Sequence, residues 1–263
     1  MAARYWVGGT GTWDASDTTH WAASSGGAGG QSVPTSADSV VIDAASGTAP
    51  YTITVVGSMT IGGLTFLLGT ATLDFASSNM TFTGVVNFSG TATRTVKYGS
   101  GTHTFNNNLS MNNTGLTLDV GTATLIQKGG GTMMTGLNAH ILKLVPGAAA
   151  GYTQWNSIPT PTVADVNFLE TDNASGPVIF AINSFTLNVK NNFHLAGHPN
   201  APTVIRGVGG GALTVDAGKA GFIDWFYAYG IALGSGITLR NGYDGLGTNR
   251  TIVPPQATAI GAL

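Results

Sequence analysis

Short segments in which hydrophobic and polar residues alternate recur along most of the chain. Between Leu64 and Gly130 they include Thr72–Phe75 and Met80–Thr83, and glycine or asparagine turns follow them. Alternation with a period of two predicts a β-strand with one buried face, and the turn residues predict where it ends. A single short strand cannot bury its apolar face alone, so the pattern favours strands that stack on one another.

The same stretch also repeats itself. The tetrapeptide GTAT begins at Gly69, Gly90 and Gly121, and the related GTHT begins at Gly101, so successive offsets are 21, 11 and 20 residues. A longer phrase, LTFLLGTATLDF from Leu64, recurs 52 residues later as LTLDVGTATLIQ. Offsets close to multiples of about ten residues indicate a repeat architecture. We therefore predict an all-β fold, a β-solenoid in the form of a right-handed parallel β-helix, although the pattern itself does not set the handedness.

Composition favours stacked strands over a disordered chain. Charged residues make up only 8% of the sequence, against roughly 25% in ordinary globular proteins, and 39 of the 263 residues are glycine. Hydrophobic residues make up 43% and lie in alternating runs, which disordered chains rich in Gly, Ser and Thr lack. A chain of this length can bury one substantial core, with Thr, Ser and Asn on the outer faces of its strands.

Residues 1–45 have a different residue pattern, and we expect them to form an aromatic, Gly-rich N-terminal cap. Trp6, Trp13 and Trp21 lie within sixteen residues, and His20 precedes the last of them. The open end of a solenoid exposes core and strand edges unless something covers it, and large aromatic rings are suited to that role. The alternative hypothesis, that these rings stack on sugars, is less favoured.

The spacing of these residues resembles that of a known sequence module. Residues 4–43 read W-x-G-G-x-G-x-W, then H-W, a glycine pair, a proline and D-x-V-x-I-D. This resembles a module that begins many β-helical proteins of bacterial surfaces, and a very similar form occurs in structural proteins of tailed bacteriophages. The match covers about a seventh of the chain. It implies virion or surface architecture, and it supplies no catalytic residues.

Residues 46–253 are expected to form the solenoid, with an irregular excursion near residues 132–162 and a C-terminal tail at residues 254–263. The stretch from Phe193 to Thr203 is expected to be a corner between coils. A second aromatic segment lies near the end of the solenoid, and we predict that it forms a C-terminal cap or an oligomer contact. Its members are Phe222, Trp225, Phe226, Tyr227 and Tyr229.

No pattern of carboxylates indicates catalysis. Three pairs of carboxylates are close in sequence: Asp14 and Asp17, Asp38 and Asp43, and Glu170 and Asp172. An Asp in a Gly-rich turn, however, more often bonds its own backbone. Glycoside hydrolysis needs two carboxyl groups that face each other across a groove, and the sequence gives no sign of such a pair. We therefore predict no catalytic residues and a protein that is not an enzyme.

Metal and cofactor sites also lack a specific signal. His194 and His198 are closely spaced, but they lie beside Gly197 and Pro199 rather than on a helix, and no third ligand accompanies them. The chain contains no cysteine, no P-loop and no nucleophile elbow. We predict neither a metal nor a cofactor.

Charge and hydropathy bear on partners and location. The net charge is −2 and the ten Lys and Arg residues are scattered, which gives nucleic-acid binding little support. No apolar run reaches the roughly eighteen residues of a membrane span. The N-terminus lacks the pattern of a signal peptide, so we expect a chain made and kept in the cytoplasm unless something else exports it.

These observations favour a non-enzymatic structural component of a bacteriophage virion. It would be a surface-displayed capsid decoration, spike or tail fibre that assembles in the host cytoplasm with other virion proteins. A homo-oligomer is expected, and a trimer by analogy with other phage solenoids. The alternatives are a tail fibre that binds a host-surface glycan through aromatic residues in 132–162 or 227–243, a polysaccharide-degrading tailspike, and a bacterial surface adhesin.

Overall fold

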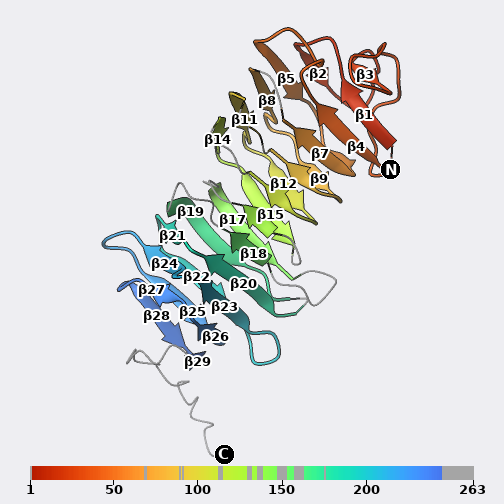
Figure 1. The fold of residues 1–263 in the computed structure, drawn as a ribbon. Helices are drawn as coiled ribbons and strands as arrows, with labels where there is room; N and C mark the ends of the chain where they lie inside the picture. Colours follow the sequence, from red (N-terminus) through yellow and green to blue (C-terminus); the bar gives the residue numbers. More distant parts are fainter. Residues whose placement is uncertain are drawn as a thin grey trace, which may run out of the picture.

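The chain forms a stack of short parallel strands in an elongated solenoid (Figure 1). The computed structural model describes residues 2–67, 70–88, 90, 92–111, 115–128, 132–134, 139–146, 153–156, 163–174 and 176–244. These residues form strands and no helix, arranged in sheets of 12, 5, 9 and 3 strands that we call sheets A, B, C and D. Among the described strands every pairing is parallel except that of β1 with β3. The predicted β-solenoid is confirmed, and its handedness stays a prediction.

In the N-terminal half each coil from β4 onward passes through sheets A, B and C in turn. The strands of sheet A are β1 (Ala2–Trp6), β4 (Asp38–Ile42), β7 (Gly63–Phe66), β10 (Val86–Asn87) and β13 (Leu109–Ser110), with β3 (Trp21–Ala22) at its end. Those of sheet B are β2 (Gly11–Trp13), β5 (Tyr51–Val55), β8 (Ala71–Asp74), β11 (Arg94–Lys97) and β14 (Leu116–Asp119). Those of sheet C are β6 (Met59–Ile61), β9 (Met80–Phe82), β12 (Thr102–Phe105) and β15 (Thr124–Lys128).

The cross-section of the coil changes in the C-terminal half. Sheet B ends at β14, and a new sheet D begins at β22 (Phe193–Ala196) and continues through β25 (Gly221–Asp224) and β28 (Ile237–Arg240). Sheet A continues through β16 (Thr132–Met134), β18 (Thr153–Asn156), β20 (Val178–Asn183), β23 (Thr203–Val208), β26 (Phe226–Tyr229) and β29 (Tyr243–Asp244). Sheet C continues through β17 (Ala139–Val145), β19 (Val163–Thr171), β21 (Thr186–Val189), β24 (Ala212–Val215) and β27 (Ala232–Leu233). The final coils therefore pass through sheets A, C and D.

Strand register explains the spacing of the sequence repeats. In sheet A, Val40 pairs with Leu64 and Leu64 pairs with Val86, so one coil takes 24 and then 22 residues. Gly90 lies at the corner that leads into sheet B, whereas Gly101 and Gly121 lie at the next corner, which leads into sheet C. The spacing of about ten residues is therefore the distance between neighbouring corners, and a full coil takes about twice that spacing. The phrase LTFLLGTATLDF begins in strand β7 of sheet A, whereas its repeat LTLDVGTATLIQ begins in strand β14 of sheet B. Similar sequences are therefore used at two different corners of the coil.

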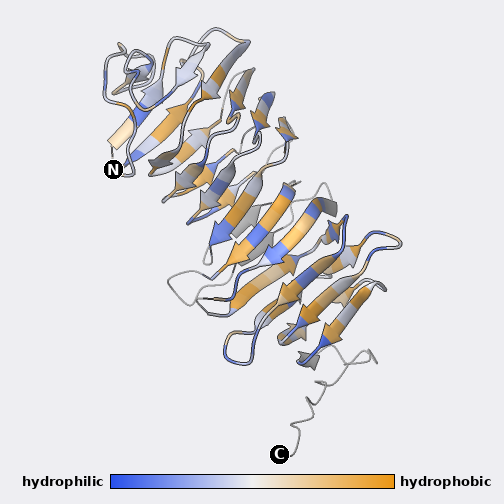
Figure 2. Cartoon of the chain, turned by 180° about the vertical axis from the view of Figure 1, so that it is seen from behind, coloured by the Kyte–Doolittle hydropathy of each residue, from blue (hydrophilic) through white to orange (hydrophobic). Residues whose placement is uncertain are grey.

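Inward positions of each strand form the core and outward positions form the surface. Ile53, Leu73 and Val96 stack in sheet B with no exposed surface, and Phe82 packs on Phe105 with ring centroids 5.1 Å apart. Burying such side chains stabilises the fold by about 1.5–3 kcal/mol each. Figure 2 shows the resulting alternation of hydrophobic and hydrophilic positions along the strands.

Arg94 and His103 are among the polar side chains buried inside the N-terminal coils. Arg94 is fully buried, and its Nη1 donates to the Phe66 carbonyl at 2.7 Å, which ties one coil to the next. His103 is also fully buried, with Nε2 2.8 Å from the Tyr98 carbonyl oxygen and its ring 4.9 Å from that of Phe75. Burial lowers the pKa of His103, so the ring is held in its neutral form.

Parts of the chain differ from the sequence-based expectation. Within residues 132–162 the described segments include strands β16, β17 and β18, which pair in register within sheets A and C. The rest of the predicted excursion, at residues 135–138, 147–152 and 157–162, lies outside the described residues. The expected corner from Phe193 to Thr203 begins with strand β22 of sheet D, and only residues 197–202 form the corner. The tail at residues 254–263 lies outside the described residues.

Candidate functional site

The tryptophans of the N-terminal module lie inside the end of the solenoid. Strand β3 pairs antiparallel with β1 and is the last strand of sheet A. Trp6, Trp13 and Trp21 have no exposed surface. The Trp21 ring meets Trp6 edge-on at 5.2 Å and Trp13 at 5.1 Å between centroids. Edge-to-face pairs add about 0.5–1.5 kcal/mol each beyond the area they bury. None of these three indoles has a face open to a sugar, which favours a role as a cap over the alternative of stacking on sugars.

His20 fits the same cluster through close packing. Its ring lies flat on Trp6 at 4.5 Å, and its Nδ1 is 2.7 Å from the Val7 carbonyl oxygen. A Cβ at Gly11 would stand 2.4 Å from His20 Nε2, so a larger residue there would displace the His20 ring. The glycines of the W-x-G-G-x-G-x-W pattern therefore let the aromatic residues approach one another.

The carboxylates of this module act as turn residues. Asp14 Oδ1 accepts hydrogen bonds from the backbone N–H groups of Asp17 and Ser16, both at 2.7 Å, and these bonds lower its pKa. Asp17 Oδ1 likewise accepts hydrogen bonds from the hydroxyl and the backbone N–H of Thr19, and these bonds lower the pKa of Asp17. The predicted turn role of Asp14 and Asp17 is confirmed. A lowered pKa makes a carboxyl a poor proton donor near neutral pH.

Asp172, of the second carboxylate pair, is also engaged by other groups. Asp172 accepts a hydrogen bond from the Ala174 backbone N–H and lies 3.2 Å from Lys143 Nζ, and both contacts lower its pKa. Asp172 is therefore held on the surface as an ion-paired turn residue.

The C-terminal aromatic residues do not form one lid. Along β26 they alternate, so Phe226 is buried while Tyr227 and Tyr229 point outward and are 50% and 43% exposed. Phe222 lies on sheet D, where the Arg240 guanidinium sits 4.3 Å above its ring. Strands β27, β28 and β29 follow along the chain and pair beyond β24, β25 and β26. One further described coil therefore lies beyond these aromatic residues, and their role as a C-terminal cap or an oligomer contact stays a prediction.

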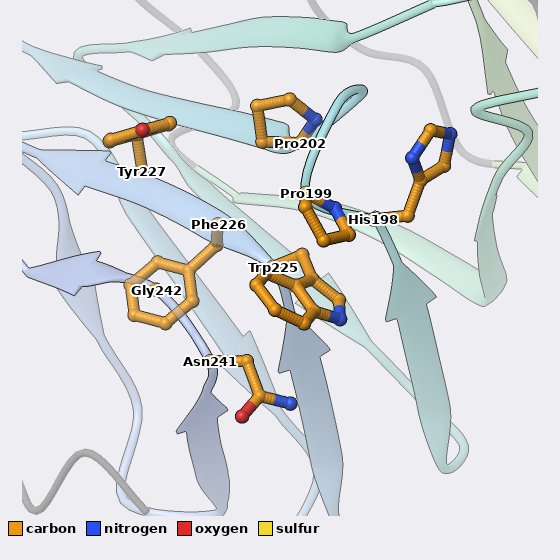
Figure 3. Close-up of a pocket in the computed structure, with 8 residues that line it drawn as sticks. All are labelled: His198, Pro199, Pro202, Trp225, Phe226, Tyr227, Asn241 and Gly242. Carbon is orange, nitrogen blue, oxygen red and sulfur yellow. The ribbon is translucent and has the colours of Figure 1, made fainter. Parts of the chain in front are cut away.

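A hollow of about 220 Å³ lies beside these aromatic residues (Figure 3). It is formed where the chain turns from sheet D back to sheet A on three successive coils. The upper coil makes this turn with residues 197–202, the next with Trp225 alone, and the last with Asn241 and Gly242. The long upper loop therefore overhangs two short corners. The lining residues are His198, Pro199, Pro202, Trp225, Phe226, Tyr227, Asn241 and Gly242.

The upper loop is held in place by its own hydrogen bonds. His198 and Ala201 bond each other through both backbone N–H groups, at 3.2 and 2.9 Å. The buried Asn173 Nδ2 donates to the Ala201 carbonyl at 3.0 Å, from the coil above. The wall of the hollow is therefore fixed by the neighbouring coil.

The two lower corners carry unusual backbone angles. Trp225 has φ of 50° and Asn241 has φ of 53°, in the left-handed region. One residue in this region can turn the chain between two strands, and Asn accepts it more readily than a bulky residue does. In addition, Asn241 Oδ1 is buried and accepts no hydrogen bond from any part of the chain that the structure describes.

A second hollow, of about 230 Å³, lies on the outer face of sheet B. A ladder of threonines from successive strands, Thr52, Thr72 and Thr95, lines it together with Tyr51 and Pro50. No ring lies on its surface as Trp225 does in the first hollow, because Tyr51 is 4% exposed. The hollow at the D–A corner is therefore the better candidate.

The histidine pair considered for zinc does not converge on a metal centre. His194 Nε2 lies 2.5 Å from Asp224 Oδ2 on the neighbouring strand of sheet D. His198 lines the hollow instead. In the residues with described positions, no group of three or more His, Cys, Asp or Glu could hold a metal ion.

Sequence reasoning singled out Trp225 and Tyr227 but missed Asn241, Pro199 and Pro202. The available signal was the absence of any turn residue between GFID and FYAY, which leaves Trp225 alone as the corner. No helix among the described residues is long and apolar enough to cross a membrane. Comparisons of the chain with protein-family models, with curated proteins and with solved structures found no match.

Proposed function

We propose that this protein is a non-enzymatic structural component of a bacteriophage virion. It would be a surface-displayed β-solenoid that serves as a capsid decoration, spike or tail fibre. The observation that carries the proposal is the module at residues 4–43, whose tryptophans are buried at the end of the solenoid. Its sequence pattern is the part of the chain that resembles phage structural proteins.

The physical character of the fold supports this role. A parallel ladder runs from β1 to β29, so most backbone groups are paired between coils. Such a rod resists proteases and unfolding, because opening it requires breaking many adjacent hydrogen bonds together. A particle that persists outside cells needs this kind of kinetic stability. One end or face would dock on other virion proteins, and a homo-oligomer, such as a trimer, would form the displayed unit.

The test is to locate the chain in purified particles. Antibodies raised against the recombinant protein would be applied to gradient-purified virions from a lysate in which the chain is produced. Quantitative mass spectrometry of the same particles would give the copy number. We expect a fixed stoichiometry, with many copies for a capsid decoration and few for a tail or vertex protein. Recovery only from the bacterial envelope would favour the adhesin, and recovery only from the soluble lysate would contradict a virion role.

A further inference from the structure

We infer that the hollow at the D–A corner binds a neutral saccharide, with the Trp225 indole as its stacking platform. This inference does not depend on a virion role, since a bacterial surface protein could use the same site. It rests on the position of Trp225, on the chemistry of the lining residues and on the size of the hollow.

The backbone at position 225 does not favour tryptophan. A bulky residue in the left-handed region is a conformational outlier, and such strain is of order 1–3 kcal/mol. The next coil makes the equivalent corner with Asn241 and Gly242, residue types suited to this conformation. A corner alone would thus be made more easily by Asn or Gly than by Trp.

The indole is not required for the core either. Phe226 and Ile223, on either side of this corner, are only 1% and 0% exposed. Trp225, in contrast, is partly exposed and lines the hollow. Figure 3 shows its ring between Pro199 and Asn241. Strain without compensating burial in the core is typical of residues held for a binding role.

The lining favours a ligand with both apolar and hydroxyl-bearing surfaces. Trp225 and Tyr227 offer rings that the apolar C–H face of a pyranose can stack on. Asn241 and His198 offer hydrogen-bonding groups for hydroxyls. Pro199 and Pro202 stiffen the overhanging loop, so little conformational entropy is lost on binding.

The charge of the lining residues and the volume of the hollow further restrict the class of ligand. Among the described residues no Asp, Glu, Lys or Arg lines the hollow, so none of them would neutralise a carboxylate, a sulfate or a nucleotide phosphate there. A volume of about 220 Å³ is below the 300–1,000 Å³ typical of drug-sized ligand sites and suits a single sugar ring. The ligand is therefore the neutral terminal hexose or N-acetylhexosamine of a glycan.

The test uses the full-length protein on a printed array of glycans that end in neutral hexoses, neutral N-acetylhexosamines, or acidic sugars. Saturation-transfer NMR with the methyl glycosides of glucose, galactose, mannose and N-acetylglucosamine would then follow. We expect binding to a subset of the neutral probes. Trp225→Asn should lower that binding by about fivefold to 150-fold, since stacking on an aromatic ring is worth roughly 1–3 kcal/mol.

A matched control is available on the same strand. Tyr229 is 43% exposed but does not line the hollow, so Tyr229→Ala should leave binding within about twofold of wild type. Trp225→Asn should keep or raise the melting temperature because it relieves backbone strain. Should that variant fail to fold, Tyr227→Ala and Asn241→Ala would replace it, and each should weaken binding. The inference is wrong if the wild type binds no neutral probe, binds acidic probes alone, or binds equally well without these side chains.

Discussion

Trp21 and Trp225 lie near opposite ends of the solenoid, and their surroundings differ. Trp21 is fully buried between Trp6 and Trp13, whereas Trp225 is partly exposed at a corner with φ of 50°. In the first case the indole stabilises the end of a stack by area buried and ring contacts. In the second its backbone is strained and its ring lines a hollow. The same residue type thus supports stability at one end and is available for recognition at the other.

The coils around these residues differ in the same way. The N-terminal coils pass through sheets A, B and C and contain buried Arg94 and His103, while the C-terminal coils pass through A, C and D. The hollow lies at the D–A corner, so it could not form on the N-terminal coils, which have no sheet D. The change of cross-section is therefore what places the candidate site in the C-terminal half of the molecule.

The largest expected effect is the loss of a capping indole. Trp21→Ala should destabilise the protein by about 3–5 kcal/mol, because it removes a fully buried ring and leaves a cavity between two others. Denaturant unfolding gives the free energy, and hydrogen exchange should show the earliest opening in β1 and β2. A loss as large for Trp225→Asn would erase the proposed difference between the two ends.

Two glycines with similar backbone angles sharpen the comparison of the two halves. Gly99 has φ of 66°, and an added Cβ would stand 1.6 Å from the Ala76 carbonyl oxygen of the coil before it. Gly218 has φ of 77° with nothing within 4 Å. Gly218→Ala should cost about 1–2 kcal/mol from conformation alone, and Gly99→Ala about 1–3 kcal/mol more from overpacking. Equal unfolding midpoints for the two variants would mean that the N-terminal corners are not close-packed.

His103 should make the N-terminal half sensitive to mild acid. Its pKa in the folded protein is lowered by burial, so below about pH 6.5 the unfolded chain takes up a proton that the folded chain does not. This contribution to stability is complete above pH 6.5 and is lost as pH falls toward the folded pKa. His103→Leu should flatten the pH dependence of the melting temperature below about pH 6.5. The exposed His198 serves as the control, and a slope that follows His198→Asn instead would contradict the assignment.

The smallest expected effect concerns the surface of the C-terminal half. Lys190 Nζ lies 3.0 Å from Asp165 Oδ1 and 3.6 Å from Asp216 Oδ1, which bridges successive coils outside sheet C. Lys190→Ala should cost less than about 1 kcal/mol, and the loss should shrink further in high salt. Lys97→Ala, which removes a longer 4.0 Å contact with Asp74, should have a still smaller effect. Thermal unfolding at low and high salt would measure both.

Local pattern was enough to predict the fold class and several local roles. Alternation in Thr72–Phe75 and Met80–Thr83 matches the buried and outward positions of these strands, because the face depends only on a period of two. Asp14 and Asp17 bond backbone groups two or three residues away, so their turn role was also local. The strand nature of Phe193–Ala196 was missed because the prolines and glycine that follow it dominated the local signal.

By itself the sequence determined that this chain stacks short half-buried strands into a solenoid with tryptophans gathered near one end. Only the tertiary structure decided which sheet each strand joins, where sheet B gives way to sheet D, and which corners meet. The reason is physical: a short alternating strand pairs as well in one sheet as in another, and its choice depends on corner lengths summed over whole coils. Pro199, Trp225 and Asn241 are 26 and 16 residues apart in the chain, and only the register of three coils brings them to one hollow.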